Sequence, residues 1–348
     1  MASRRTRGNR KKRGLGAAGF FLALILLLAV LAAAAAGWMI FIPFGPSNET
    51  FVEIEPGSSS TRIAQQLESA GVVRNQFAFD LWRWVRRGKL KAGEYRFDHP
   101  APLPEVYDRI ARGDVYTVAV TVREGATIFE VAARLEQAGI GTGQQFLDQQ
   151  ERLTELVADI DPKAKTLEGY LFPDTYRFPR RATSGQVAAA MVRRFRLEAS
   201  QIGLRENVHK VVTLASLVER ETAVDAERPL VASVFENRLA KHMPLMTDPS
   251  VIYGLEVEKE WRGAIHASDL KRDTPYNTYL HQGLPPGPVA NPGLPSLRAA
   301  MNPAQSNYLY FVAAGANPQG KSLFSATLEE HARDVSGYRK ALKKAGQR

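Results

Sequence analysis

Two glutamates close an apolar helical segment, Leu214–Glu221, which reads LASLVERE. Between residues 211 and 218 only one threonine and one serine are polar, so the sequence predicts a helix over Val208–Glu221 that is buried nearly all round. An ionised carboxylate is costly in such surroundings, and burial raises the pKa of a carboxyl group. A glutamic acid that keeps its proton near neutral pH in this way can act as a general acid. A buried glutamate paired with an arginine is the alternative.

The two carboxylates of this helix, Glu219 and Glu221, point in different directions. At about 100° per residue they stand about 200° apart around the helix axis. They therefore do not easily share one site, and periodicity alone does not say which of them faces a cleft.

Three other segments are rich in polar and turn-forming residues, which an ordinary core does not require. The first is Leu167–Tyr176 (LEGYLFPDTY), the second Met243–Gly254 (MPLMTDPSVIYG) and the third Tyr276–Gly293 (YNTYLHQGLPPGPVANPG). Together with the helix ending at Glu219, they resemble the endolytic murein (lytic) transglycosylases, the YceG-like family. The resemblance covers most of the chain after an N-terminal apolar segment and is densest over Leu167–His331.

The resemblance implies a reaction and an acid. The essential glutamate of the family corresponds to Glu219, and Glu221 becomes a structural partner of Arg228 or Arg238. The acid would protonate the oxygen between MurNAc and GlcNAc within a nascent glycan strand, with help from the substrate acetamido group. The MurNAc 6-hydroxyl would then attack the anomeric carbon and leave a 1,6-anhydroMurNAc end, which would terminate elongation of that strand. The implied partners are peptidoglycan strands and the penicillin-binding proteins of the elongation or division machinery.

Candidate substrate-binding residues come from the same motifs. Their aromatic faces, amides and hydroxyls suit sugar rings and N-acetyl groups, and the prolines form a stiff loop that can wall a groove. For the aspartate, capping of a helix is favoured over contact with a sugar hydroxyl. The Pro-rich loop could instead bind a partner as polyproline II. The candidates are Asp248, Tyr276, Asn277, Thr278, Tyr279, Pro285, Pro286, Asn291 and Ser325.

Three rival functions stay open. A muramidase-type hydrolase would need a second carboxylate beside Glu219, for which Glu168 and Asp248 are candidates. A noncatalytic peptidoglycan-binding membrane anchor would not need Glu219 at all. A triad of Ser325, His331 and Glu219 is the third, although the sequence contains no GxSxG motif.

The N-terminus predicts a membrane anchor. The formal net charge of +10 includes seven basic residues between residues 4 and 13, and the rest of the chain carries only about +3, so nucleic-acid binding is not indicated. Residues 15–42 are apolar and exceed the ~20 residues that a spanning helix requires. Basic residues stay on the cytoplasmic side, so we expect a single-pass inner-membrane protein with its catalytic region periplasmic. A cleaved signal peptide is the alternative.

The fold class predicted is α+β. We expect a cytoplasmic tail (1–14), a transmembrane helix (15–42), a linker (43–50), a LysM-like region (51–160) and a mixed α/β catalytic domain (161–342). The LysM-like region contains an ungapped repeat at a spacing of 68 residues, VEIEPG at Val52 and VTVREG at Val120, each a strand and a glycine turn before an amphipathic helix. The repeat either binds glycan or serves only as a scaffold. The domain boundary is expected between Glu151 and Ala188.

The chain has no cysteine, and its six histidines show no metal-binding spacing. We therefore expect no thiol chemistry, no metal and no cofactor.

Overall fold

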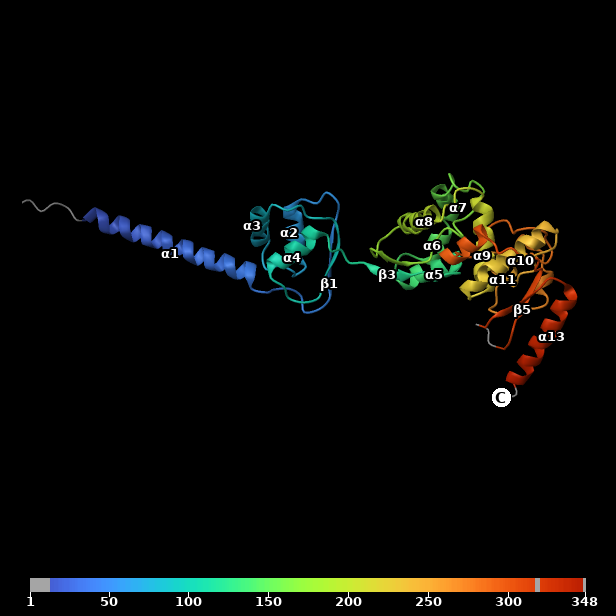
Figure 1. The fold of residues 1–348 in the computed structure, drawn as a ribbon. Helices are drawn as coiled ribbons and strands as arrows, with labels where there is room; N and C mark the ends of the chain where they lie inside the picture. Colours follow the sequence, from blue (N-terminus) through green and yellow to red (C-terminus); the bar gives the residue numbers. More distant parts are fainter. Residues whose placement is uncertain (1–12, 317–319, 347–348) are drawn as a thin grey trace, which may run out of the picture. The chain divides into compact units, whose positions relative to one another are not determined.

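The computed structural model describes residues 13–316 and 320–346, which form two compact units (Figure 1). Unit 1 comprises Met1–Tyr116 and unit 2 comprises Thr117–Arg348. The division thus precedes the boundary expected from sequence, and the second copy of the repeat belongs to unit 2. The predicted tail, residues 1–14, lies outside the described residues except for its last two.

Unit 1 is a small α+β unit that follows a long apolar helix. β1 and β2 pair antiparallel, with Val52 opposite Tyr95. Alternate side chains of each strand point inward, so both of these residues are buried against α2, α3 and α4. The elements of unit 1 are α1 (Arg13–Phe41), β1 (Thr50–Ile54), α2 (Ser60–Ser69), α3 (Gln76–Arg86), β2 (Gly93–Phe97) and α4 (Leu103–Arg112).

The long helix α1 corresponds to the predicted anchor. Its segment Gly19–Phe41 has a mean hydropathy of 2.7, and the apolar stretch of this segment is not buried against the rest of the protein. By length and composition this segment is a candidate membrane span.

Unit 2 places helices around one large core and carries two separate antiparallel strand pairs, β3 with β4 and β5 with β6. The elements of unit 2 are β3 (Val118–Thr121), α5 (Ile128–Gln137), α6 (Gly143–Leu147), α7 (Gln150–Leu153), η1 (Thr154–Leu156), β4 (Thr175–Phe178), α8 (Ser184–Gln201), α9 (Val208–Glu221), η2 (Asp225–Glu227), α10 (Arg228–Ala240), α11 (Asp248–Val257), η3 (Asp269–Lys271), α12 (Leu294–Met301), β5 (Tyr310–Ala313), β6 (Ser322–Ser325) and α13 (Leu328–Ala345).

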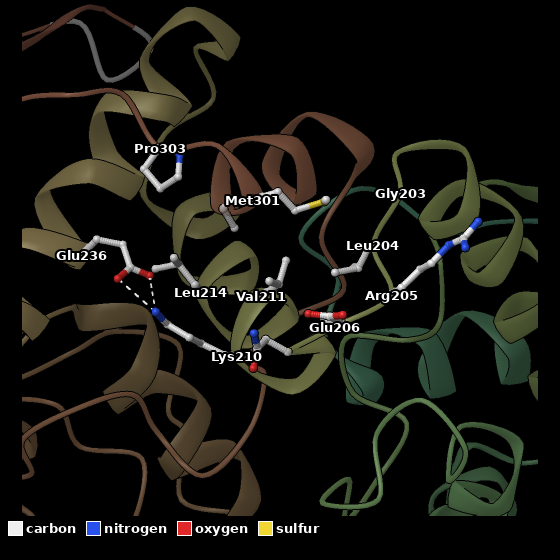
Figure 2. Close-up of a pocket in the computed structure, with 12 residues that line it drawn as sticks. Gly203, Leu204, Arg205, Glu206, Lys210, Val211, Leu214, Glu236, Met301 and Pro303 are labelled. Carbon is white, nitrogen blue, oxygen red and sulfur yellow. Dashed lines mark hydrogen bonds and ion pairs between the residues drawn. The ribbon is translucent and has the colours of Figure 1, made fainter.

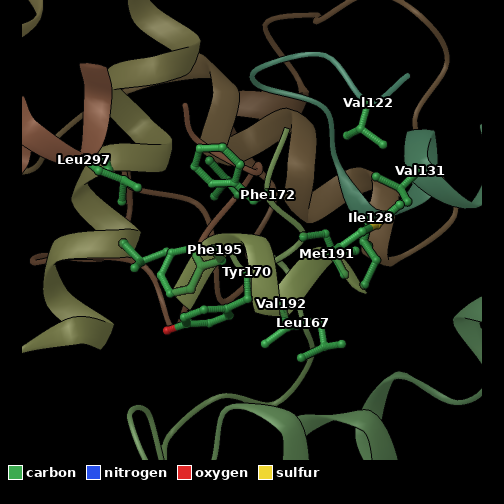
Figure 3. Close-up of a cluster of buried hydrophobic side chains, with 14 of the residues drawn as sticks. Val122, Ile128, Val131, Leu167, Tyr170, Phe172, Met191, Val192, Phe195 and Leu297 are labelled. Carbon is green, nitrogen blue, oxygen red and sulfur yellow. The ribbon is translucent and has the colours of Figure 1, made fainter. Parts of the chain in front are cut away.

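The core of unit 2 joins segments that are far apart in the sequence. Figure 3 shows Ile128 and Val131 of α5 gathered with Tyr170, Phe195 of α8 and Leu297 of α12. The rings of Tyr170 and Phe195 meet edge to face at 5.1 Å. This core fixes the loop around Tyr170 against α8, and so fixes the segment that contains Glu168.

Helix α9 runs through the centre of unit 2 and has the predicted bounds. Its residues from Val212 to Val218 are all buried, and it packs against α10, α11 and α12. The hydroxyl of Ser216 accepts a hydrogen bond from the Val289 backbone N–H at 3.0 Å. This bond ties the middle of the helix to the end of the Pro-rich loop, Leu284–Pro288. The buried face of α9 therefore positions this loop as well as the two glutamates.

The sequence repeat is also a structural repeat. Each copy is a strand followed by a tight turn and a helix, β1 with α2 and β3 with α5. The turn glycines Gly57 and Gly125 both have positive φ, 82° and 72°, a backbone region that favours glycine. The two copies pair with different strands and belong to different units, so they do not form one module. The mixed α+β class is therefore confirmed, whereas the likeness to LysM modules stays a prediction.

Candidate active site

Glu219 ends the buried part of α9 and is held by two contacts. Its Oε1 lies 2.8 Å from Nη1 of Arg228, and both side chains are only 5% exposed. Its Oε2 accepts a hydrogen bond from the Gly293 backbone N–H at 2.9 Å. The buried ion pair with arginine, an alternative at the level of sequence, is thus the arrangement found. Of the two arginines expected beside Glu221, Arg228 instead contacts Glu219.

Arg228 is itself fixed on several sides. It is the first residue of α10, and its Nε donates to Asp225 at 3.0 Å. Its Nη1 also donates to the Ser296 hydroxyl on α12. The guanidinium therefore joins the ends of three helices at the Glu219 carboxylate.

Glu124 is a second carboxylate in this cluster. A Cβ added to Gly293 would lie 2.0 Å from its Oε1, so the Glu124 carboxyl rests against the backbone of the residue that donates to Glu219. Burial, and then repulsion from Glu219, raise the pKa of Glu124 above its ordinary value, while Arg228 acts in the opposite direction. A carboxyl group whose pKa is raised in this way keeps its proton to a higher pH than an exposed carboxyl group does.

The sequence repeat contains a signal that could have identified Glu124. Glu124 lies in the VTVREG turn, where the first copy of the repeat has Pro56 at the matching position. A carboxylate that replaces the turn proline in only one copy is not needed for the turn itself. We name the four residues Glu124, Glu219, Arg228 and Gly293 the acid cluster.

Backbone pairing holds the two loops of the acid cluster together. The N–H of Gly125 donates to the Asn291 carbonyl, and the N–H of Asn291 donates to the Ala126 carbonyl, both at 2.9 Å. Glu124 and Gly293 flank this pairing. Their contact is therefore fixed by backbone hydrogen bonds and does not depend on side-chain packing alone.

Asn291 and Glu168 form a buried network behind the acid cluster. The Asn291 amide oxygen accepts from the N–H groups of Gly169 and Leu171, and its Nδ2 donates to Glu168 at 2.8 Å. The other Glu168 oxygen accepts from the Ile128 N–H at 2.7 Å. Burial raises the pKa of Glu168 to about 8. Glu168 is 2% exposed, so it orients these loops and has no open face toward a cleft.

Glu221 lies on another side of α9 and lines a cavity of about 450 Å³. It accepts a hydrogen bond from the Thr247 hydroxyl at 2.5 Å, and burial raises its pKa to about 7. Attraction from Arg238 lowers the pKa and repulsion from Asp248 raises it. Of the two arginines expected beside Glu221, Arg238 is the one that shares its cavity. The cavity, which we name the Glu221 cavity, is lined by Glu221, Phe235, Arg238, Leu245, Met246, Asp248, Tyr279, Tyr310, Phe311, Leu328 and His331.

Two predicted substrate-binding residues meet in the Glu221 cavity. The Tyr279 hydroxyl donates to Asp248 at 2.6 Å. Asp248 stands in the first turn of α11, where Thr247 occupies the N-cap position, so the expected capping role is wrong. The ring of His331 stacks on Tyr310 at 5.0 Å, and burial and then Arg238 lower its pKa.

The other predicted binding residues lie at separate places. Asn277 and Thr278 are buried. The side-chain amide of Asn277 donates to the backbone carbonyls of Leu270 and Arg272. The hydroxyl of Thr278 accepts a hydrogen bond from the Thr247 backbone N–H. The hydroxyl of Ser325, also buried, donates to Asp334 at 2.8 Å, a bond different from the one that a triad with His331 would need.

The three remaining candidates, Tyr276, Pro285 and Pro286, lie at or beside the Pro-rich loop. The ring of Tyr276 meets that of Tyr253 at 4.8 Å. Pro285 and Pro286 belong to the loop itself, and the Pro286 carbonyl lies 3.1 Å from His209 Nε2. The structure thus brings Asn291 close to the acid cluster, and Asp248 and Tyr279 close to Glu221.

A further hollow of about 660 Å³ opens at the other end of α9, and Figure 2 shows the side chains around it. Lys210 forms an ion pair with Glu236 at 2.9 Å across one side, and Met301 and Pro303 border another. Arg205 and Glu206 lie on the loop before α9. None of the four residues of the acid cluster lines this hollow, so it is separate from that cluster. In the part of the chain that the structure describes, no group of three or more His, Asp or Glu side chains is arranged to hold a metal ion.

Comparisons with known proteins agree with this architecture. The model of the YceG-like family matches residues 52–337. A protein of Bacillus subtilis (strain 168) named endolytic murein transglycosylase is 34% identical over 301 residues, which cover 80% of this chain and 82% of that protein. A protein of the same name from Streptococcus pneumoniae (strain R6) is 29% identical over 333 residues, but the match covers only 60% of its length. A crystal structure of a YceG-like protein from Listeria monocytogenes has a TM-score of 0.54 at 33% identity, covering 83% of this chain and 99% of the other.

Proposed function

The chain belongs to the YceG-like family, and from that membership we propose that it is an endolytic murein transglycosylase whose acid is Glu219. The observation that carries the proposal is the acid cluster. It places the glutamate that corresponds to the family's essential residue beside a second carboxyl, Glu124, whose pKa is raised. A carboxyl group whose pKa is raised by burial keeps its proton to a higher pH than an exposed one, as a general acid requires.

The proposed reaction cleaves the bond between MurNAc C1 and the GlcNAc oxygen. The acid cluster protonates that oxygen as the bond breaks, and the substrate acetamido group supports the positive charge that develops on the sugar. The MurNAc 6-hydroxyl then bonds to C1 and returns its proton to the carboxylate. The products are a GlcNAc 4-hydroxyl and a 1,6-anhydroMurNAc end, and no water is consumed.

Arg228 and Gly293 hold Glu219 in position for both proton transfers. The guanidinium at 2.8 Å and the N–H at 2.9 Å are donors for a carboxylate, which is the state that must accept the proton from the 6-hydroxyl. The Glu219 side chain is only 5% exposed. A glycosidic oxygen therefore reaches it only if the Glu124 side chain or the loop at Gly293 moves aside on binding.

A muramidase-type hydrolase is the second candidate, and Glu124 is the observation that favours it. Hydrolytic glycosidases use two carboxyl groups, and Glu124 could activate a water that attacks C1. The two bases considered from sequence are placed less well, since Glu168 is buried in the network with Asn291 and Asp248 lines the Glu221 cavity.

The proposed location follows from α1 and the basic residues before it. We place α1 across the inner membrane with the N-terminus in the cytoplasm and unit 2 on the periplasmic side. Such an anchor confines cleavage to nascent strands near the membrane, where penicillin-binding proteins polymerise them. The cleavage then terminates elongation of the strand.

Digestion of uncrosslinked glycan strands tests the function, with products identified by mass. Internal fragments that end in anhydroMurNAc support the transglycosylase. Fragments heavier by one water would establish the hydrolase instead. Binding of strands without any cleavage, by a chain whose α1 is in a lipid bilayer, would favour a noncatalytic anchor.

A further inference from the structure

The amphipathic helix α3 of unit 1 carries a stripe of exposed apolar side chains. Phe77, Leu81, Trp84 and Val85 are 70%, 46%, 69% and 57% exposed. Their spacing of four, three and one residues places them on one side of the helix. The core of unit 1 takes a different side, where Phe79 is fully buried. Large apolar side chains that line up in this way on a folded surface indicate a contact with another apolar phase.

The end of the candidate membrane span adjoins this stripe. The ring of Phe41, at the last residue of α1, meets the ring of Trp82 on α3 edge to face at 5.6 Å. Trp82 stands beside the stripe on the helix surface, between it and the core side. The guanidinium of Arg74, just before α3, lies 4.2 Å from the ring centre of Trp38 on α1. The apolar surface of α1 therefore continues onto α3.

The charges near the stripe are mostly basic, although Asp80 on α3 is acidic. Arg83 and Arg87 are exposed at the C-terminal end of α3, and Lys89 follows them. A basic helix with tryptophan and phenylalanine on its apolar side is the composition of interfacial helices, which lie in the plane of a bilayer surface that contains anionic lipids.

We propose that α3 lies in the interface of the same bilayer that α1 spans, in the leaflet at the C-terminal end of α1. Phe77, Leu81, Trp84 and Val85 enter the boundary between headgroups and acyl chains, and Arg83 and Arg87 contact lipid phosphates. Unit 1 thereby rests on the membrane surface. The proposal depends on the anchorage by α1 put forward above and is independent of the catalytic role of Glu219.

Site-directed spin labelling of the full chain tests this, because the chain has no cysteine of its own. Single cysteines replace Trp84 on the stripe, Val30 in the span and Leu197, which is 50% exposed on α8 of unit 2. Each labelled protein is reconstituted into vesicles of phosphatidylethanolamine and phosphatidylglycerol. Collisions of the label with oxygen, which concentrates in lipid, are compared with collisions with a water-soluble nickel complex.

The expected result is that Trp84→Cys resembles Val30→Cys, with oxygen collisions exceeding nickel collisions several-fold, whereas Leu197→Cys shows the opposite order. A label at position 84 that behaves like the one at 197, while the one at 30 is in lipid, overturns the proposal and leaves the anchor intact. Shielding of position 84 from both reagents means that a protein covers the stripe, which also overturns it. A label at position 30 in water refutes the anchorage and this proposal together, without bearing on catalysis.

Discussion

The guanidinium of Arg228 lies 2.8 Å from the carboxylate of Glu219, and both side chains are 5% exposed. The proposed acid is therefore not a solitary carboxyl in an apolar pocket. It is one partner of a buried ion pair, and burial raises the pKa of the nearby Glu124 carboxyl.

Removal of the cation should destabilise unit 2 strongly. Arg228→Met leaves Glu219 and Asp225 without their partner, and loss of one member of a buried pair costs about 3–5 kcal/mol. Urea unfolding measures the change. Arg272→Met is the control, because the ion pairs of that arginine are open to solvent and screened, so their loss should cost far less. Equal effects of the two substitutions would contradict a structural role for the buried pair.

Loss of the second carboxyl should change the pH dependence of cleavage. The pKa of Glu124 is raised by burial and by repulsion from Glu219, so Glu124→Gln removes a carboxyl group that holds its proton to higher pH than usual. We expect the alkaline limb of the kcat/KM profile to move to lower pH, with activity near neutrality reduced. An unchanged profile would show that Glu124 does not share the catalytic proton. If wild type instead yields fragments heavier by one water and Glu124→Gln does not, Glu124 is the base that activates water for hydrolysis.

A methyl group at Gly293 should displace Glu124 without breaking the fold. The added Cβ would lie 2.0 Å from Glu124 Oε1, whereas the φ of −76° and ψ of 173° at Gly293 suit any residue. Gly293→Ala should therefore reproduce the shifted pH profile of Glu124→Gln at nearly unchanged stability. Gly287→Ala is the matched control in the same loop, since its nearest new neighbour would be 3.9 Å away. Wild-type kinetics in Gly293→Ala would contradict the contact.

Glu168 should make stability fall with rising pH. Its pKa is raised from the ordinary 4.5 to about 8, mainly by burial. Between these values the folded protein binds a proton that the unfolded chain lacks, so the free energy of unfolding decreases as the pH rises through this window. Glu168→Gln lacks this titration. Wild type should thus gain stability relative to Glu168→Gln when urea unfolding is measured near pH 5 instead of pH 8, and a constant difference would contradict the assignment.

The sequence predicted what depends on local pattern. The bounds of α9 follow from an apolar run that only a buried helix can accommodate, and the separation of Glu219 from Glu221 follows from helical periodicity alone. The span at α1 and the turns at Gly57 and Gly125 are equally local signals.

The sequence did not predict contacts made by tertiary packing. Glu124 reaches the acid cluster because a backbone pairing joins Gly125 to Asn291, far away along the chain. Arg228 reaches Glu219 and not Glu221 because η2 returns the chain to that side of α9. The position of Asp248 and Tyr279 beside Glu221 likewise depends on how α11 packs, which no motif spacing contains.

The most direct measurement compares Glu219→Gln with Glu221→Gln in the digestion of glycan strands, since the two substitutions are identical and two residues apart on one helix. Glu219→Gln keeps one acceptor oxygen for Arg228 but turns an amide N–H toward the Gly293 N–H, so folding is checked by urea unfolding. Cleavage should fall by about 10²–10⁴-fold. Glu221→Gln replaces a carboxyl whose pKa is about 7 by its neutral isostere and should leave cleavage within a few-fold of wild type. Loss of cleavage in Glu221→Gln with retention in Glu219→Gln would contradict the account and move the active site to the Glu221 cavity.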